Sequence, residues 1–188
     1  FSFAGLFAFV SGSPFVYMEY FKASPEMFAG LVALNALAMV AMNLVNAKLM
    51  GDMDSTKKLV VGGFLLAAVS LNLMAVAYFN LGLIYVVAAV VMYVGCLGLT
   101  AANAIAGALA SAKQYAGMVS GVNGVLQFGL GAGASAVVSV AASASAMTMN
   151  ATMAVCGLLS FCCVLWLLFK QDRANRVSQP HAIASEVV

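Results

Sequence analysis

The sequence predicts an all-α membrane protein with six transmembrane helices, and three observations lead to this prediction. Hydrophobic residues make up 64% of the 188 residues and charged residues only 7%, whereas soluble domains are about a quarter charged. The apolar residues form runs of about 20, the length that a helix needs to cross the hydrocarbon core of a bilayer. Polar clusters separate most of these runs. We therefore expect the chain to lie in a lipid bilayer.

Each predicted span is bounded by a polar segment or by a turn. The first span, residues 1–20, ends at the segment KASPE, and the second, 27–50, begins after it and ends at GDMDSTKK. The third, 59–79, begins after the lysines of that segment and ends at an Asn that precedes the fourth span, 82–102. The fourth span can continue through an Ala-rich stretch to residue 112.

The last two spans are separated from the fourth by the segment SAKQY. They cover residues 116–142 and 146–169, and these two spans run closest together, with their boundary near Ser143. A polar tail, residues 170–188, follows the sixth span, and we expect it to be mobile. The chain begins at Phe1 inside an apolar run, which favours a fragment of a longer protein.

The positive residues predict an orientation in the membrane. If both chain ends and the second and fourth connections face the cytoplasm, seven of the eight Lys and Arg residues lie on that side, and only Lys22 lies outside. This is the positive-inside pattern, and it requires an even number of spans. The seven residues are Lys48, Lys57, Lys58, Lys113, Lys170, Arg173 and Arg176.

The fifth span consists mostly of small residues. Gly117 and Gly121, then Gly129 and Gly133, form two GxxxG steps, a spacing that lets another helix approach closely. The sequence therefore predicts that the fifth helix is buried in the bundle and that these four glycines pack against neighbouring helices.

Several kinds of chemistry are not expected from these residues. No Asp, Glu, Lys, Arg or His lies in the middle of a span, although such residues usually mark proton or ion pathways. The four cysteines lie in apolar runs without metal-ligand spacing, so we expect no metal and no cofactor. A net charge of +2 without a basic stripe argues against nucleic acid. The lone His181 is in the tail, so a serine protease has no base, and we expect no catalytic residues.

Two groups of neutral polar residues could line a substrate cavity. In the first span, Pro14 removes a helical hydrogen bond beside Ser13 and Tyr17, and interrupted helices recur at transporter binding sites. The alternative is a static kink that only shapes packing. In the fifth span, Asn123 and Gln127 are one turn apart beside Phe128. Each amide, including Asn35 in the second span, could instead bond to a neighbouring helix.

These motifs in this order resemble the C-terminal half of the Bcr/CflA drug-efflux family, which belongs to the drug:proton antiporters of the major facilitator superfamily. The similar segments are Ser11–Val16, Ser24–Phe28, Leu34–Leu37 and, in the fifth span, Gly124–Phe128. The segment NAKLMGDMDSTKKLVVGG resembles the family's loop between the eighth and ninth helices, and GLTAANAIAGALASAKQYAGMVSGVNGVLQFGLGAGAS resembles its tenth-to-eleventh region. The family usually has a Pro-Asn pair late in its tenth helix, whereas here Ala102 precedes Asn103.

The resemblance implies helices seven to twelve of a twelve-helix transporter of the bacterial inner membrane, without its N-terminal six-helix half. It implies export of small amphiphilic drugs in exchange for protons, with the proton-carrying acid in the N-terminal half. The substrate-cavity candidates are then Ser13, Pro14, Tyr17, Asn35, Asn123, Gln127 and Phe128. The alternative function is a self-contained six-helix channel or assembly subunit, including a homodimeric one.

Overall fold

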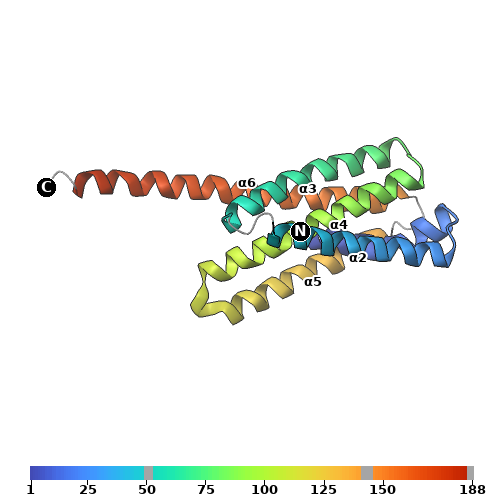
Figure 1. Cartoon of the computed structure of the whole chain (residues 1–188), viewed down its shortest axis with the longest axis horizontal. Helices are drawn as coiled ribbons and strands as arrows, with labels where there is room; N and C mark the ends of the chain where they lie inside the picture. The colour runs from blue at the N-terminus through green and yellow to red at the C-terminus, as the bar shows by residue number, and fades with distance from the viewer. Residues whose placement is uncertain (49–52, 141–145, 186–188) are drawn as a thin grey trace.

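Helices that lie alongside one another make up the fold, as the computed structural model in Figure 1 shows. The structure describes the backbone of residues 1–48, 53–140 and 146–185, and the side chains of the same ranges as far as residue 173. Within these ranges every element is helical, as predicted for an all-α membrane protein. In chain order they are α1 (Ser2–Pro14), η1 (Phe15–Tyr20), α2 (Pro25–Lys48), α3 (Ser55–Tyr78), α4 (Leu83–Ser111), η2 (Lys113–Tyr115), α5 (Ala116–Val140) and α6 (Ala146–Ser185).

Helices α2 to α6 are each long and apolar enough to cross a membrane. Helix α1 has only 13 residues, but the π-helix η1 follows it directly, so helical backbone runs from Ser2 to Tyr20. The two elements together correspond to the first predicted span. The predicted ends at residues 50 and 142, and the boundary near Ser143, lie outside the described residues.

Pro14 changes the type of helix without ending it. The N–H of Phe15 bonds back to the carbonyl of Gly12, and beyond it the chain widens into η1, where the N–H of Phe21 donates to the carbonyl of Val16 at 3.1 Å. A proline deprives the preceding turn of one hydrogen bond, and a π-helical turn is one way in which a helix continues past such a defect. The interruption expected at this proline is therefore a π-helical turn in a continuous helix.

The sequence at the start of α2 explains why a helix begins there. Ser24 accepts a hydrogen bond from the N–H of Met27 through its hydroxyl at 3.2 Å, as an N-cap residue does. Pro25 occupies the first helical position, where its missing N–H costs nothing. Lys22, just before, has a φ of 56°, so the chain reverses sharply between η1 and α2.

The core lies where α1, α3, α4 and α6 meet, around the fully buried Tyr93 of α4. Two glycines make room for this ring. A Cβ on Gly5 of α1 would overlap the Tyr93 hydroxyl, and a Cβ on Gly157 of α6 would overlap the hydroxyl of Ser70 and lie 3.0 Å from the ring. The Tyr93 hydroxyl donates to the carbonyl of Ser2 at 3.3 Å.

Helix α5 packs on α1 along one face. A Cβ on Gly131 would lie 2.6 Å from the ring of Phe7, Ser135 donates to the carbonyl of Phe7 at 3.2 Å, and the hydroxyls of Ser11 and Ser139 are 3.1 Å apart. Small residues thus do allow close approach, as expected.

The glycines of the two GxxxG steps are not the ones that α1 contacts. A Cβ on any of the four would meet nothing within 4 Å in this chain. Most of α5 is exposed, and its buried residues are Gly131, Ala134 and Val138. Within the described chain α5 is mostly exposed and these four glycines contact no neighbouring helix, so the expected packing through them stays a prediction. The four residues are Gly117, Gly121, Gly129 and Gly133.

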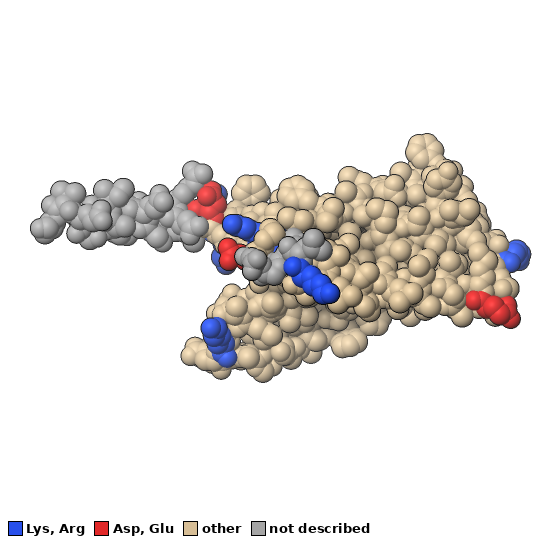
Figure 2. All heavy atoms as spheres, viewed as in Figure 1, with Lys and Arg blue, Asp and Glu red and all other residues tan. Residues whose placement is uncertain are grey.

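Charged side chains gather at the two ends of the bundle, with a band of uncharged surface between them (Figure 2). In the sequence, Lys57 and Lys113 lie beside the connections that follow α2 and α4, and Lys22 lies in the connection before α2, close to Glu19 and Glu26. This distribution is typical of a protein that spans a bilayer.

Helix α6 is longer than its apolar segment. Its backbone stays helical from Ala146 to Ser185, beyond the predicted end of the span at Phe169, and Figure 1 shows it running past the other helices. Lys, Gln, Arg and Ala all favour helix, so the sixth helix continues into the polar tail. The end of the apolar segment of α6 therefore predicts where the helix leaves the membrane, but not where the helix itself ends.

Candidate substrate cavity

The larger of two neighbouring cavities contains the amides that the sequence singled out on the fifth helix. It has a volume of about 440 Å³ and lies between the start of α1 and helices α4, α5 and α6. This is within the usual range for a site that binds a small molecule. Its polar side chains are Asn123, Gln127, Thr100, Ser160 and Ser2, and the rest of its lining is apolar.

The period of the helix places the two amides of α5 in this cavity. Asn123 and Gln127 are four residues apart, so they lie on one face, one above the other, and both are half-buried. Thr100 approaches from α4, although its hydroxyl donates to the carbonyls of Cys96 and Leu97 at 3.0 and 3.2 Å. For the amides of Asn123 and Gln127, as for the hydroxyls of Ser2 and Ser160, the described residues give no hydrogen bond.

Phe128, which we predicted beside them, is outside the cavity. It is 63% exposed and lies edge-to-face against Phe7 of α1, with ring centroids 5.8 Å apart. It follows Gln127 by one residue, which on a helix turns it about 100° away from the cavity.

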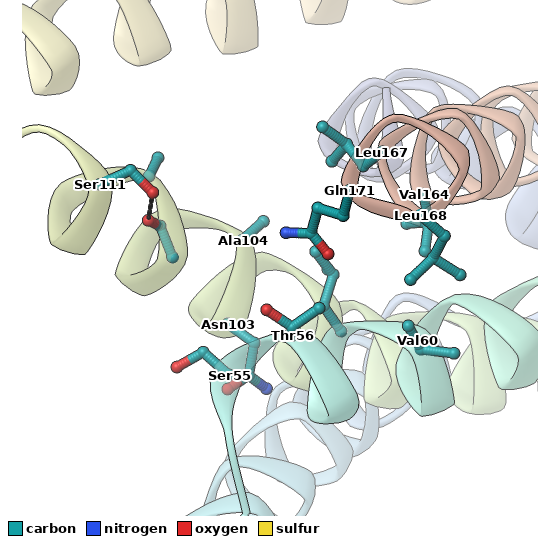
Figure 3. Close-up of a pocket in the computed structure, with 13 residues that line it drawn as sticks. Ser55, Thr56, Val60, Asn103, Ala104, Ser111, Val164, Leu167, Leu168 and Gln171 are labelled. Carbon is teal, nitrogen blue, oxygen red and sulfur yellow. Dashed lines mark hydrogen bonds between the residues drawn. The ribbon is translucent and has the colours of Figure 1, made fainter. Parts of the chain in front are cut away.

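A smaller cavity of about 260 Å³ lies between α3, α4 and α6 (Figure 3). Gln171 projects from α6 into the space between Ala104 of α4 and Thr56 of α3. Four apolar residues line both cavities and lie between them. They separate the space that contains Gln171 from the one that contains Asn123 and Gln127. The shared residues are Leu59, Ala104, Val164 and Leu167.

Asn103 lines the smaller cavity and links two helices. Its side-chain amide donates to the carbonyl of Leu99 at 2.7 Å and to the side-chain oxygen of Asn46 on α2 at 3.1 Å. The Asn that follows Ala102, where the resembled family has a Pro-Asn pair, thus ties α2 to α4.

The remaining predicted residues lie away from both cavities. Ser13 and Tyr17 are buried, and the Tyr17 ring packs edge-to-face between Phe9 and Phe28, with centroid distances of 6.2 and 6.1 Å. Asn35 is buried and donates to the carbonyl of Leu31 in its own helix at 2.8 Å. Neither these three nor Pro14 lines a cavity that contains Asn123 and Gln127, so the predicted set divides into two groups.

Sequence reasoning missed another buried amide, Asn150 near the start of α6. It is 1% exposed, and neither its oxygen nor its nitrogen has a hydrogen-bond partner in the described chain. The Tyr17 hydroxyl and the side-chain oxygen of Asn35 are in the same condition. A buried amide inside a predicted span was the pattern that could have identified Asn150, since such a group is costly in hydrocarbon unless paired.

The side chains that line both cavities are neutral. None of their lining residues is Asp, Glu, Lys, Arg or His, and the described residues contain no group of three His, Cys, Asp or Glu that could hold a metal. The larger cavity can therefore bind apolar surface by contact and a few polar atoms through amides and hydroxyls.

A comparison with protein families decides what kind of protein has this arrangement. The family model of the Major Facilitator Superfamily matches residues 1–186. The chain belongs to this superfamily. The resemblance to a major facilitator transporter and the predicted all-α membrane fold are thereby confirmed.

Two relatives refine this membership of the major facilitators. A bicyclomycin resistance protein homolog of Haemophilus influenzae is 26% identical over 160 residues, which are 85% of this chain and 40% of that protein. The uncharacterized MFS-type transporter YdgK of Bacillus subtilis is 27% identical over 128 residues, 68% of this chain and 32% of that protein. The chain thus spans about two fifths or less of these relatives. No solved structure matches it.

Proposed function

We propose that this major facilitator chain is the C-terminal six-helix half of a multidrug efflux transporter, which exports small amphiphilic drugs in exchange for protons. The similarity to a bicyclomycin resistance protein homolog supports drug export. Alternating access would then result from rocking of the two halves around a central cavity. The membrane would be the bacterial inner membrane.

The single observation that carries this proposal is the larger cavity. It pairs extensive apolar lining with Asn123 and Gln127 on one face of α5, which is how sites for varied amphiphilic molecules are usually built. An apolar drug gains contact with the lining, and one or two polar atoms are oriented by the amides. Ser13, Tyr17 and Asn35 would act differently, by shaping the turn at η1 and the packing of α2.

The proton pathway is assigned to the half that precedes this chain. Neither cavity has Asp, Glu, Lys, Arg or His in its lining, so the side chains here would orient the drug and not carry the proton. The exposed faces of α2 and α5, which bury few residues, are the surfaces on which the N-terminal half would pack.

The proposed orientation places the cationic end in the cytoplasm. Lys48, Lys57, Lys58, Lys113, Lys170 and Arg173 follow or precede the helices at one end, as the positive-inside rule requires of the cytoplasmic side. The C-terminus then lies in the cytoplasm as well.

The test is drug accumulation in cells that lack their own efflux pumps and express the full reading frame. Unchanged protein should lower accumulation, a protonophore should abolish the effect, and Gln127→Ala should reduce export about three- to tenfold, the effect of one lost hydrogen bond. Gln171→Ala is the matched control, because it removes the same amide from the smaller cavity. Normal export by Gln127→Ala at equal abundance would refute the cavity assignment, and no export by unchanged protein would refute drug efflux.

A second candidate is a self-contained six-helix channel or assembly subunit that pairs with its own copy. The apolar exposed faces of α2 and α5 favour it, because a second copy could cover them as well as another half could. Cross-linking of the expressed protein in membranes distinguishes the two, since only this candidate yields a homodimer joined through α2 or α5.

A further inference from the structure

Four side chains form one face of α6 at the point where it leaves the bundle. Trp166, Phe169, Lys170 and Arg173 line a shallow surface pocket of about 470 Å³. They are spaced by three, four and seven residues, which places them on one stripe of a helix. Figure 1 shows α6 continuing past the other helices here.

The aromatic residues of this face indicate its depth in the membrane. Trp166 is 62% and Phe169 70% exposed, and exposed tryptophans of membrane proteins are enriched at the headgroup level, where their amphipathic rings are stable. The amine of Lys170 is 5.3 Å from the centre of the Trp166 ring, a cation–π contact that holds the lysine beside the indole.

The two cations then lie in the headgroup layer or at its outer edge. At 1.5 Å per residue, Lys170 is about 6 Å and Arg173 about 10 Å beyond Trp166 along the helix. The polar layer of one leaflet is roughly 5–8 Å thick, so the Lys170 backbone lies within it and that of Arg173 just beyond it. The long side chain of Arg173 can turn back to phosphates of the same leaflet. No carboxylate is among the four residues that line the pocket.

We propose that this face of α6 binds the headgroup of an anionic phospholipid. Arg173 and Lys170 contact the phosphate, the guanidinium through paired N–H groups, while Trp166 and Phe169 pack against the glycerol and the upper part of the acyl chains. Asp172 lies between the two cations in the sequence but does not line the pocket. Two cations in a lining without a carboxylate favour a headgroup with net negative charge over a zwitterionic one, whose own amine they would repel. This site does not depend on what the protein transports.

Trp166 is the single tryptophan of this chain, so the part of the fluorescence quenching that is lost on replacing it reports on the site. The full-length protein is placed in nanodiscs whose lipid contains an equal fraction of either phosphatidylglycerol or phosphatidylcholine, brominated close to the headgroup. Bromine quenches indole fluorescence on contact, and the Trp166→Phe variant gives the background. We expect the brominated phosphatidylglycerol to be enriched at Trp166 by about fivefold or more, since each cation near anionic lipid contributes roughly that factor.

Three variants make the result specific. In K170Q/R173Q the two lipids should quench equally, whereas K170R/R173K, which keeps both charges, should retain the preference. Lys113→Gln removes a cation from the same end of the bundle but from η2, and it should change nothing. Equal quenching by both lipids in the unchanged protein, or a preference that persists in K170Q/R173Q, would overturn the proposal.

Discussion

Helices α2, α4 and α5 are all apolar membrane helices, yet α4 is largely buried in the fold, whereas α2 and α5 are largely exposed. The most apolar windows of α2 and α4 have similar mean hydropathies of 2.0 and 2.3. However, α4 buries twelve of its 29 residues, α2 buries only Asn35, and α5 buries three. Hydropathy thus indicates that a helix enters the membrane but not which neighbours it meets there, because lipid chains are as apolar as leucine.

Glycines show the difference between the two regions most clearly. In the core, the side chain of Tyr93 occupies the space beside Gly5, and that of Ser70 occupies the space beside Gly157. On α5, Gly129 and Gly133 face open space within this chain. Glycine is therefore required in the core, whereas on α5 this chain leaves room for a larger residue. Substitution by alanine tests this difference.

The largest expected effect is that of Gly157→Ala. The new methyl group overlaps the hydroxyl of Ser70, which bonds to the Leu66 carbonyl at 2.7 Å, and it crowds the Tyr93 ring. Overpacking of a core costs about 1–3 kcal/mol, so the midpoint of thermal unfolding should fall by about 5–10 °C. A thiol-reactive dye measures it in detergent, because Cys96 and Cys156 are buried. The exposed Cys162 and Cys163 are first replaced by serine.

Gly133→Ala is the matched control for this comparison. A Cβ there meets nothing within 4 Å, and alanine stabilises a helix by up to about 1 kcal/mol relative to glycine. Its midpoint should therefore stay the same or rise. A fall as large as that of Gly157→Ala would mean that Gly133 is as closely packed as the core, against the difference between the regions drawn above.

A smaller effect is expected where the two regions join, at Gly98 of α4. A Cβ on Gly98 would lie 3.0 Å from the backbone oxygen of Met39 and 3.3 Å from the side-chain oxygen of Asn43, so Gly98→Ala must move α2 outward. We expect a loss of about 1–2 kcal/mol of unfolding free energy. Gly107→Ala, also on α4 but in open space, is the control. Equal stability of the two variants would show that α2 is not held by close approach to α4.

The sequence was sufficient to predict the membrane fold, since length and polarity of the segments follow from the bilayer itself. Contacts between helices were less predictable. Both Gly131 and Gly133 are small residues of α5, and only the first meets Phe7. The choice between them depends on how α5 is rotated about its axis, which a nearly uniform run of Gly, Ala, Ser and Val does not determine.

The candidate cavity was predictable in part for a related reason. Asn123 and Gln127 share a face because helical period fixes their relation, and they do line one cavity. Tyr17 and Asn35 are on other helices, so whether they join that cavity depends on tertiary packing. Asn150 was overlooked because a single amide near a helix start resembles a boundary residue.

The smallest expected effect tests the hydrogen bond that joins α2 to α4. Asn103 donates to Asn46 at 3.1 Å across the two helices, and interhelical hydrogen bonds in membranes contribute about 0.6 kcal/mol on average. Asn46→Ala, Asn103→Ala and the double variant form a cycle that isolates this pair from the bond of Asn103 to its own helix. We expect a coupling energy of about 0.6 kcal/mol in unfolding experiments. A coupling near zero, together with a clear effect of Gly98→Ala, would mean that α2 is attached to the core by close packing alone.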